Sequence, residues 1–185
     1  MARTNILSLL EGGDRRMIGR ADEVAAMVSK QPQLFPELMA GLWSSDPLVC
    51  MRAADAVEKI TRERRELLQP YRKKLLQLMN EASQQELRWH LALMVPRLRL
   101  NAGELRTAVF ALSAYLEDRS SIVKTCALQG LAELAEGAEE IRPAVVKVLR
   151  RAAQSGTPAM KARSLKLLHR LRTERTYERC DSETV

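Results

Sequence analysis

The segment VKTCALQGLAEL, residues 123–134, shows the pattern that decides the fold of this chain. Six of its positions are apolar or small, namely Val123, Ala127, Leu128, Gly130, Leu131 and Leu134. Residues three and four apart lie on the same face of an α-helix, so this spacing predicts one broad apolar stripe along a helix.

The same pattern recurs at three other places in the chain. It aligns without gaps with residues 49–60, 87–98 and 160–171, and the four starts are separated by 38, 36 and 37 residues. Three residues before the four segments stand Asp46, Gln84, Ser120 and Thr157. Asp, Ser and Thr are common helix N-caps, and Pro47 and Pro158 follow at a position where proline is tolerated. The residues therefore predict four helices that start at equivalent points of a repeat.

A second helical pattern precedes each of these helices, over residues 34–43, 67–79, 104–116 and 141–153. Pro36, Pro70 and Pro143 occupy early positions in three of them. The predicted unit is helix A, a short turn and helix B, with a period of about 37 residues. We therefore expect an all-α, right-handed α-α superhelix, a solenoid of four to five antiparallel helix-pair repeats.

The predicted domain organisation is simple. Residues 1–175 form a single solenoid domain, in which residues 1–31 keep the pattern only vaguely and are expected to be a divergent N-terminal capping helix pair. Residues 176–185 are polar and are expected to be a disordered tail.

These residues resemble HEAT repeats of the armadillo-type superfamily. The resemblance rests on the helix A prolines, on Asp46-Pro47, and on the Val-Lys-x-x-Ala-x-x-x-Leu pattern from Val123 to Leu131. It covers about residues 32–172, and Pro96 departs from it by falling inside the third helix B. The resemblance implies that helix B lines the concave surface along which such solenoids bind partners, but it says little about biochemical role. The repeats, the lack of a catalytic motif and the polar face of helix B together favour a non-enzymatic scaffold or adaptor that binds a protein along this surface.

The chain lacks the short motifs of common catalytic and metal sites. It has two histidines, His90 and His169, no HExxH motif, no nucleophile elbow and no phosphate-binding glycine loop. We expect His90 to be a packing residue, His169 to be solvated, and Trp43 to lie in the core at the end of a helix A stripe. No enzymatic activity, metal or cofactor is predicted.

One alternative keeps a catalytic role open. The alkyl-DNA glycosylases built on HEAT-like repeats hold a damaged base against aromatic and acidic side chains without any short signature. Trp43, Trp89 and Tyr115 are the residues of this chain that could contribute to such a cleft.

Composition indicates the setting of the protein. The N-terminus lacks a secretory signal pattern, no apolar run approaches the roughly 20 residues of a membrane span, and three distant cysteines do not indicate a disulfide framework. We expect a cytoplasmic protein without membrane contact.

The face of helix B opposite its apolar stripe is the candidate binding surface, because positions 4, 7 and 11 of each segment lie there. The candidate partner-binding residues on this face are Arg52, Asp55, Lys59, His90, Arg97, Glu133, Arg163, Lys166 and Arg170.

The net charge of +7 is unevenly spread along the chain. Residues 1–140 hold 19 basic and 19 acidic side chains, whereas residues 141–175 hold ten basic residues and a single acidic one. Such a concentration attracts an acidic protein segment or nucleic-acid phosphates, or it serves solubility. No aromatic residue interleaves the basic ones, which disfavours a single-strand stacking surface. The leading expectation is an acidic protein partner, and a nucleic-acid-binding protein related to DNA repair is the alternative.

Overall fold

The computed structural model describes residues 5–14 and 17–182, with side chains up to residue 173. Over these residues the chain consists of nine α-helices and five short 3-10 helices, and the described part holds no strand. The prediction of an all-α protein is therefore confirmed. The chain divides into two compact units, Met1–Arg99 and Leu100–Val185, which we call unit 1 and unit 2.

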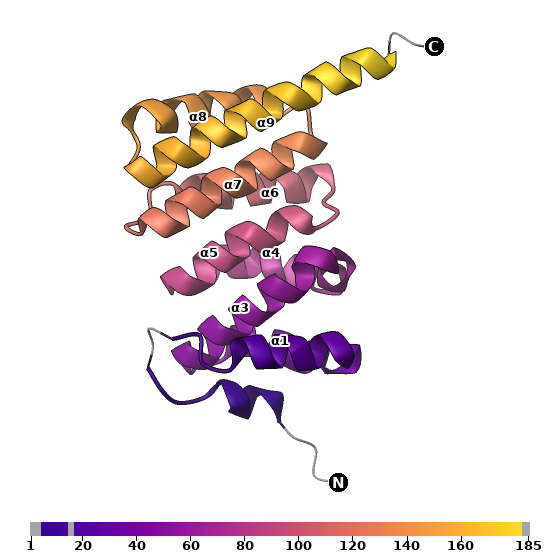
Figure 1. Cartoon of the computed structure of the whole chain (residues 1–185), viewed down its shortest axis with the longest axis vertical. Coiled ribbons are helices and arrows are strands. Elements are labelled where there is room, and N and C mark those ends of the chain that lie inside the picture. The colour runs from indigo at the N-terminus through magenta and orange to yellow at the C-terminus, as the bar shows by residue number, and fades with distance from the viewer. Residues whose placement is uncertain (1–4, 15–16, 183–185) are drawn as a thin grey trace. The chain divides into compact units, whose positions relative to one another are not determined.

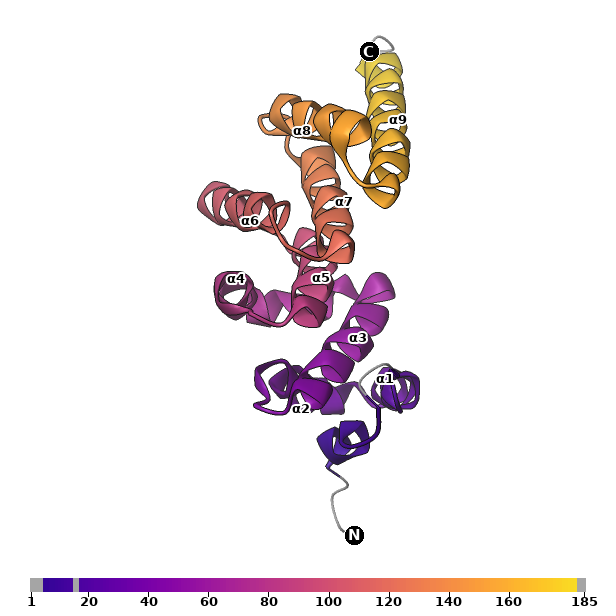
Figure 2. The same cartoon turned by 90° about the vertical axis from the view of Figure 1, so that its left-hand side faces the viewer.

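Unit 1 is built around one long helix, α3 (Pro47–Glu63), which packs against α1, α2 and α5 (Figures 1 and 2). Its core holds fully buried Leu38, Val57, Leu75 and Leu91. In chain order the elements are η1 (Ile6–Leu10), α1 (Ala21–Lys30), η2 (Pro32–Leu34), α2 (Phe35–Ala40), η3 (Gly41–Trp43), α3, η4 (Arg65–Tyr71), α4 (Arg72–Glu81), α5 (Gln85–Met94) and η5 (Val95–Arg97).

Unit 2 consists of four helices in two layers. They are α6 (Ala102–Tyr115), α7 (Ser121–Gly137), α8 (Arg142–Ser155) and α9 (Pro158–Ser182). Figure 2 shows α6 and α8 in one layer and α7 and α9 in the other. Helix α9 packs against both α7 and α8, and the core between them includes Leu131, Leu149 and Leu167.

The four helix B starts lie where the sequence predicted them. Helices α3 and α9 begin at Pro47 and Pro158, and α5 and α7 begin directly after Gln84 and Ser120. Asp46 Oδ1 accepts from the Leu48 amide at 2.8 Å, so it caps α3 as expected. Gln84 makes no cap and instead donates from Nε2 to the Pro47 carbonyl at 3.0 Å.

The helix A segments are more broken than the sequence suggested. The predicted helix over 34–43 is α2 followed by η3, and the one over 67–79 is η4 followed by α4. Pro70 lies inside η4, where its missing N–H and its ring oppose a continuous α-helix. Pro96 likewise ends α5 early, since Met94 is the last α-helical residue and Pro96 lies in η5.

Trp43 is not a core residue, contrary to the prediction. Its side chain is 42% exposed at the end of η3. The α-helical stripe stops at Gly41, where the chain tightens into a 3-10 turn and changes the direction in which each side chain points. Gly41 itself is tightly packed, because an added Cβ would lie 2.7 Å from the Ala53 Cβ.

The ends of the chain were predicted as a helical cap and a tail. Residues 5–14 and 17–31 form η1 and α1, joined by a connection in which Gly12, Gly13 and Gly19 have positive φ. Of the predicted tail, residues 176–185, the backbone of residues 176–182 continues helix α9, and residues 183–185 lie outside the described residues.

Candidate functional site

Arg52, the first residue of the predicted surface, is buried. Its side chain is 2% exposed and its guanidinium donates to the carbonyl oxygens of Leu10, Gly12, Asp14 and Met17 at 2.6–3.3 Å. A planar group with five donors can satisfy several carbonyls at once. Arg52 therefore holds the connection between η1 and α1 in place and presents no group to a partner.

Asp55 and Lys59 lie one turn apart on α3 and bond to each other. Lys59 Nζ donates to Asp55 Oδ2 at 2.7 Å and also pairs with Asp22 on α1. Burial lowers the pKa of Lys59, but the hydrogen bonds to Asp22 and Asp55 outweigh it and leave this pKa raised. The pair therefore joins α1 to α3.

Arg97 lies beside a buried carboxylate. It pairs with Glu58, which is 2% exposed, and its Nη1 donates to the Glu58 carbonyl at 2.8 Å and to Thr61 Oγ1 at 2.9 Å. Burial raises the pKa of Glu58, yet hydrogen bonds from Arg62 and Arg97 overcome that effect and leave this pKa below its ordinary value. These contacts bind η5 to α3.

His90 faces the same cluster from α5 and is 7% exposed. Burial lowers its pKa to about 4, against the attraction of Asp55 and Glu58. Its Nδ1 has no hydrogen-bond partner among the described atoms. The prediction of a packing histidine is confirmed, and His169 is exposed as expected.

In unit 2 the candidate residues from α7 and α9 meet. Arg163 Nη1 donates to Gln129 Oε1 at 2.9 Å, Gln129 Nε2 donates to Glu133 at 2.5 Å, and Arg170 pairs with Glu136. Part of the basic charge of α9 is thus compensated by α7. Lys166, in contrast, is exposed and no described acidic side chain pairs with it.

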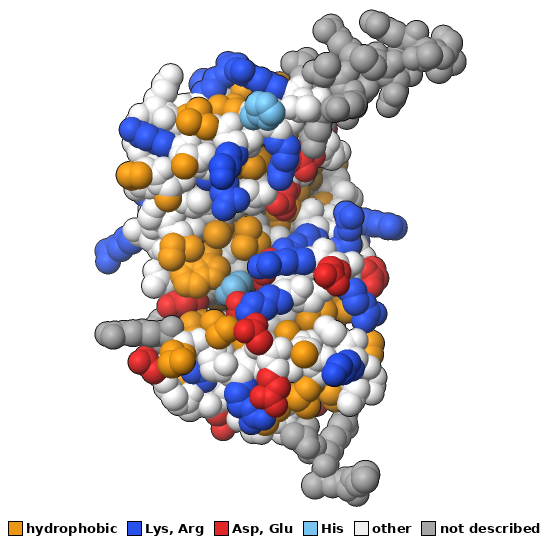
Figure 3. Space-filling model, viewed as in Figure 1, with side chains coloured by type: hydrophobic (Ala, Val, Ile, Leu, Met, Phe, Trp, Pro, Cys, Tyr) orange, Lys and Arg blue, Asp and Glu red, His pale blue; other side chains and the backbone are white. Residues whose placement is uncertain are grey.

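Five other basic residues of α8 and α9 are exposed. We call this set the basic face: Lys147, Arg150, Arg151, Lys161 and Lys166. All five side chains are exposed, and none forms an ion pair with an acidic residue in the described part of the chain. Figure 3 shows Lys and Arg side chains, with hydrophobic ones among them, over the part of unit 2 that holds α8 and α9.

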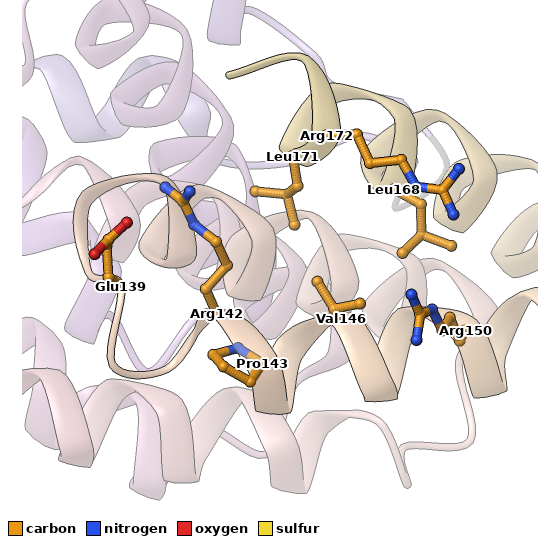
Figure 4. A pocket seen from close by; sticks show the side chains of 8 residues that line it. All are labelled: Glu139, Arg142, Pro143, Val146, Arg150, Leu168, Leu171 and Arg172. Atoms are coloured by element: carbon orange, nitrogen blue, oxygen red, sulfur yellow. The ribbon is translucent and has the colours of Figure 1, made fainter. Parts of the chain in front are cut away.

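An apolar groove lies between α8 and α9 of unit 2 (Figure 4). Its volume is about 380 Å³, and its lining residues are Glu139, Arg142, Pro143, Val146, Arg150, Leu168, Leu171 and Arg172. Leu168 and Leu171 point from α9 toward α8 and Val146. We call this feature the α8–α9 groove.

The sequence does not predict the groove, although it shows the concentration of basic residues around it. Val146 and Leu168 are half-buried and fit the stripes of their helices, so sequence spacing assigns them to the core. Only the packing of α8 on α9 shows that their outer sides stay open. Arg142, by contrast, is buried and donates to the Ala135 and Glu136 carbonyls at 3.0 and 3.3 Å, where it caps the end of α7.

Trp43 and Trp89, the tryptophans of the alternative aromatic cleft, line two separate cavities of unit 1. Tyr115, its third candidate, is a buried residue of unit 2. Within the described residues, no three His, Cys, Asp or Glu side chains come close enough together to hold a metal ion. No helix in the described part of the chain is both long enough and apolar enough to span a membrane.

Comparison with known proteins adds no relative: the chain matches no family model and no curated protein sequence.

Proposed function

We propose that this chain is a non-enzymatic protein-interaction module, a HEAT-like α-solenoid in which the basic face of unit 2 binds an acidic segment of a protein partner. The basic face carries the proposal. Five exposed cations stand on two adjacent helices without an acidic partner in the described part of the chain, whereas Arg170 of α9 pairs with Glu136 of α7. A cluster of like charges creates a positive electrostatic potential, which attracts an anionic partner.

A protein partner fits this surface better than a nucleic acid. Phosphate binding requires only cations, whereas this basic face borders an apolar groove with Val146 and Leu168 in its floor. No aromatic residue lies between residues 141 and 175 to stack on a base. A surface that combines apolar contact with peripheral cations is typical of peptide recognition.

The structure also changes which substitutions test the surface. Reversing Arg163 or Arg170 to Glu would place a new carboxylate beside Glu133 or Glu136 and disturb the packing of α9 on α7. Lys147, Arg150 and Lys161 are exposed and make no such contact, so their reversal changes charge without removing an internal bond.

The test measures binding of labelled probes by fluorescence anisotropy. The probes are an acidic peptide of about 15 residues, single-stranded DNA and duplex DNA. Each is measured at about 50 and about 200 mM NaCl, because the Debye screening length differs about twofold between these concentrations. We expect the peptide to bind, and the triple variant Lys147→Glu, Arg150→Glu, Lys161→Glu to lose at least about tenfold in affinity.

The matched control reverses three exposed basic residues of unit 1, Arg65→Glu, Lys73→Glu and Lys74→Glu. It carries the same change in net charge and should retain peptide binding to within about threefold. No peptide binding at the lower salt concentration would refute the proposal. Tighter binding of DNA than of peptide, lost in the unit 2 variant, would establish the nucleic-acid alternative.

A further inference from the structure

The α8–α9 groove is an apolar floor with cations at its rim. Leu171 is 2% exposed and forms its base, while Val146 and Leu168 are half-buried and open to solvent on one side. Arg150 extends beside Leu168 at one end of the groove (Figure 4). Arg172 lines the same feature from α9, and Glu139 is its single acidic lining residue.

Two properties of the groove restrict its occupant. A volume of about 380 Å³ is at the lower end of the range for ligand sites and accommodates a few apolar side chains. The floor runs along two packed helices, so a binding segment that follows it presents apolar residues at regular spacing, as an amphipathic helix does. The rim favours carboxylates next to those apolar residues, because Arg150 is exposed and no described acidic side chain pairs with it.

We propose that the α8–α9 groove binds an acidic amphipathic helix of a protein partner. The partner helix lies along α8 and α9, places apolar side chains spaced three and four residues apart on Val146 and Leu168, and directs a carboxylate to Arg150. This proposal rests on the proposed function and adds to it a particular binding site and the chemistry of the partner.

A second copy of this chain is a poor occupant of the groove. The chain carries a net charge of +7, so two copies repel each other at moderate ionic strength. The repulsion is strongest where positive charge is concentrated, which is the surface around the groove. Charge complementarity therefore favours a different, acidic molecule.

The experiment uses the full chain and a fluorescein-labelled peptide of about 15 residues, long enough for about four helical turns. The peptide has leucines at i, i+3, i+4 and i+7 and glutamates on its other face. A scrambled peptide has the same composition but spreads its leucines around the helix. We expect the amphipathic peptide to bind at least about tenfold more tightly than the scrambled one.

Two matched pairs of variants locate the site. Arg150→Ala should weaken binding of the amphipathic peptide about five- to tenfold, whereas Arg151→Ala, the same change at the neighbouring exposed residue outside the groove, should weaken it less than about twofold. Leu168→Ser removes part of the floor and should weaken binding about tenfold. Its control is Ile122→Ser, which removes an isomeric side chain that is 55% exposed on α7.

The outcomes separate this proposal from the proposed function. Equal binding of the two peptides, with equal losses for the two arginine variants, would mean that the basic face attracts acidic segments without using the groove, and would overturn the groove assignment only. Failure of both peptides to bind would refute the proposed function. A concentration-dependent mass increase in light scattering, abolished by Leu168→Ser, would instead assign the groove to a second copy. Circular dichroism of each variant checks that its helical content is unchanged. Arg150→Ala tests the site without altering a core residue, because Arg150 is exposed.

Discussion

At the scale of single residues, the candidate surface of unit 1 is mainly a set of internal bonds. The Arg52 guanidinium donates its hydrogen bonds to backbone carbonyls, and Arg97 bonds to Glu58 and Thr61. His90 is buried beside the same cluster with a pKa lowered to about 4. These side chains join helices, and a buried histidine of this kind makes stability depend on pH.

His90 should make unit 1 less stable as the pH falls below about 6.5. The unfolded chain binds a proton near that value, whereas the folded chain binds it only near pH 4, so protonation favours unfolding between the two. We expect the free energy of unfolding to fall by about 1–2 kcal/mol between pH 7 and pH 5. This pH range lies above the ordinary pKa of carboxyl groups, so their protonation contributes little to the change. Urea unfolding at both pH values, followed by tryptophan fluorescence, measures it.

The variant His90→Leu should remove most of this pH dependence, because it replaces a titrating group whose Nδ1 has no described partner with an apolar one. His169→Leu is the matched control, since His169 is exposed on α9 and its loss should leave the wild-type pH dependence unchanged. A His90→Leu protein that still loses as much stability as wild type at pH 5 would contradict the assignment.

At the scale of elements, Arg52 of α3 links the connection between η1 and α1 to the rest of unit 1. Its guanidinium bonds four carbonyls of residues 10–17, and Gly19 passes so close that an added Cβ would lie 2.8 Å from Arg52 Cζ. The connection has few other described anchors, since residues 11–14 and 17–20 are exposed.

The variant Arg52→Lys should release this connection while preserving the charge, because an ammonium has three donors and lacks the planar fork. We expect a loss of about 2–3 kcal/mol in the stability of unit 1 and faster proteolysis within residues 11–20. Limited digestion with mass mapping measures the cleavage sites. Arg65→Lys, at an exposed arginine of η4, should behave like wild type. Unchanged digestion of Arg52→Lys would show that other contacts hold the connection.

The elements themselves were largely predictable, since caps and prolines act locally. Asp46 with Pro47, and Pro158 after Thr157, specify helix starts through nearby backbone groups, and the structure has them there. The helix A segments were less predictable, because the break at Gly41 depends on close packing against Ala53 of another helix.

The sequence predicted the positive charge of the candidate site, but it did not predict which side chains are exposed to a partner. Spacing put Arg52 and His90 opposite the apolar stripe, yet neighbouring elements cover both, which a single-helix pattern cannot reveal. The excess charge of residues 141–175 was visible in the sequence. Which of those cations have internal partners depends on α7, whose Gln129 and Glu136 meet Arg163 and Arg170 only after packing.

At the scale of the whole molecule, the chain consists of two compact units, each with its own buried core. Both tryptophans, Trp43 and Trp89, belong to unit 1. Tryptophan fluorescence therefore reports on unit 1, whereas far-ultraviolet circular dichroism reports on the helices of both. Different regions of a protein can open with different free energies, so a local defect lowers the stability of its own region most.

A cavity in one unit should therefore change these two signals differently. Leu149→Ala, at a fully buried residue of α8, should cost about 3 kcal/mol and move part of the circular dichroism transition to lower urea while the tryptophan transition stays in place. Leu75→Ala, at an equally buried residue of α4, should shift the tryptophan transition by a similar free energy. If Leu149→Ala shifted both signals together, the two units would unfold as one cooperative structure, and the basic face would then be stabilised by unit 1 as well as by its own core.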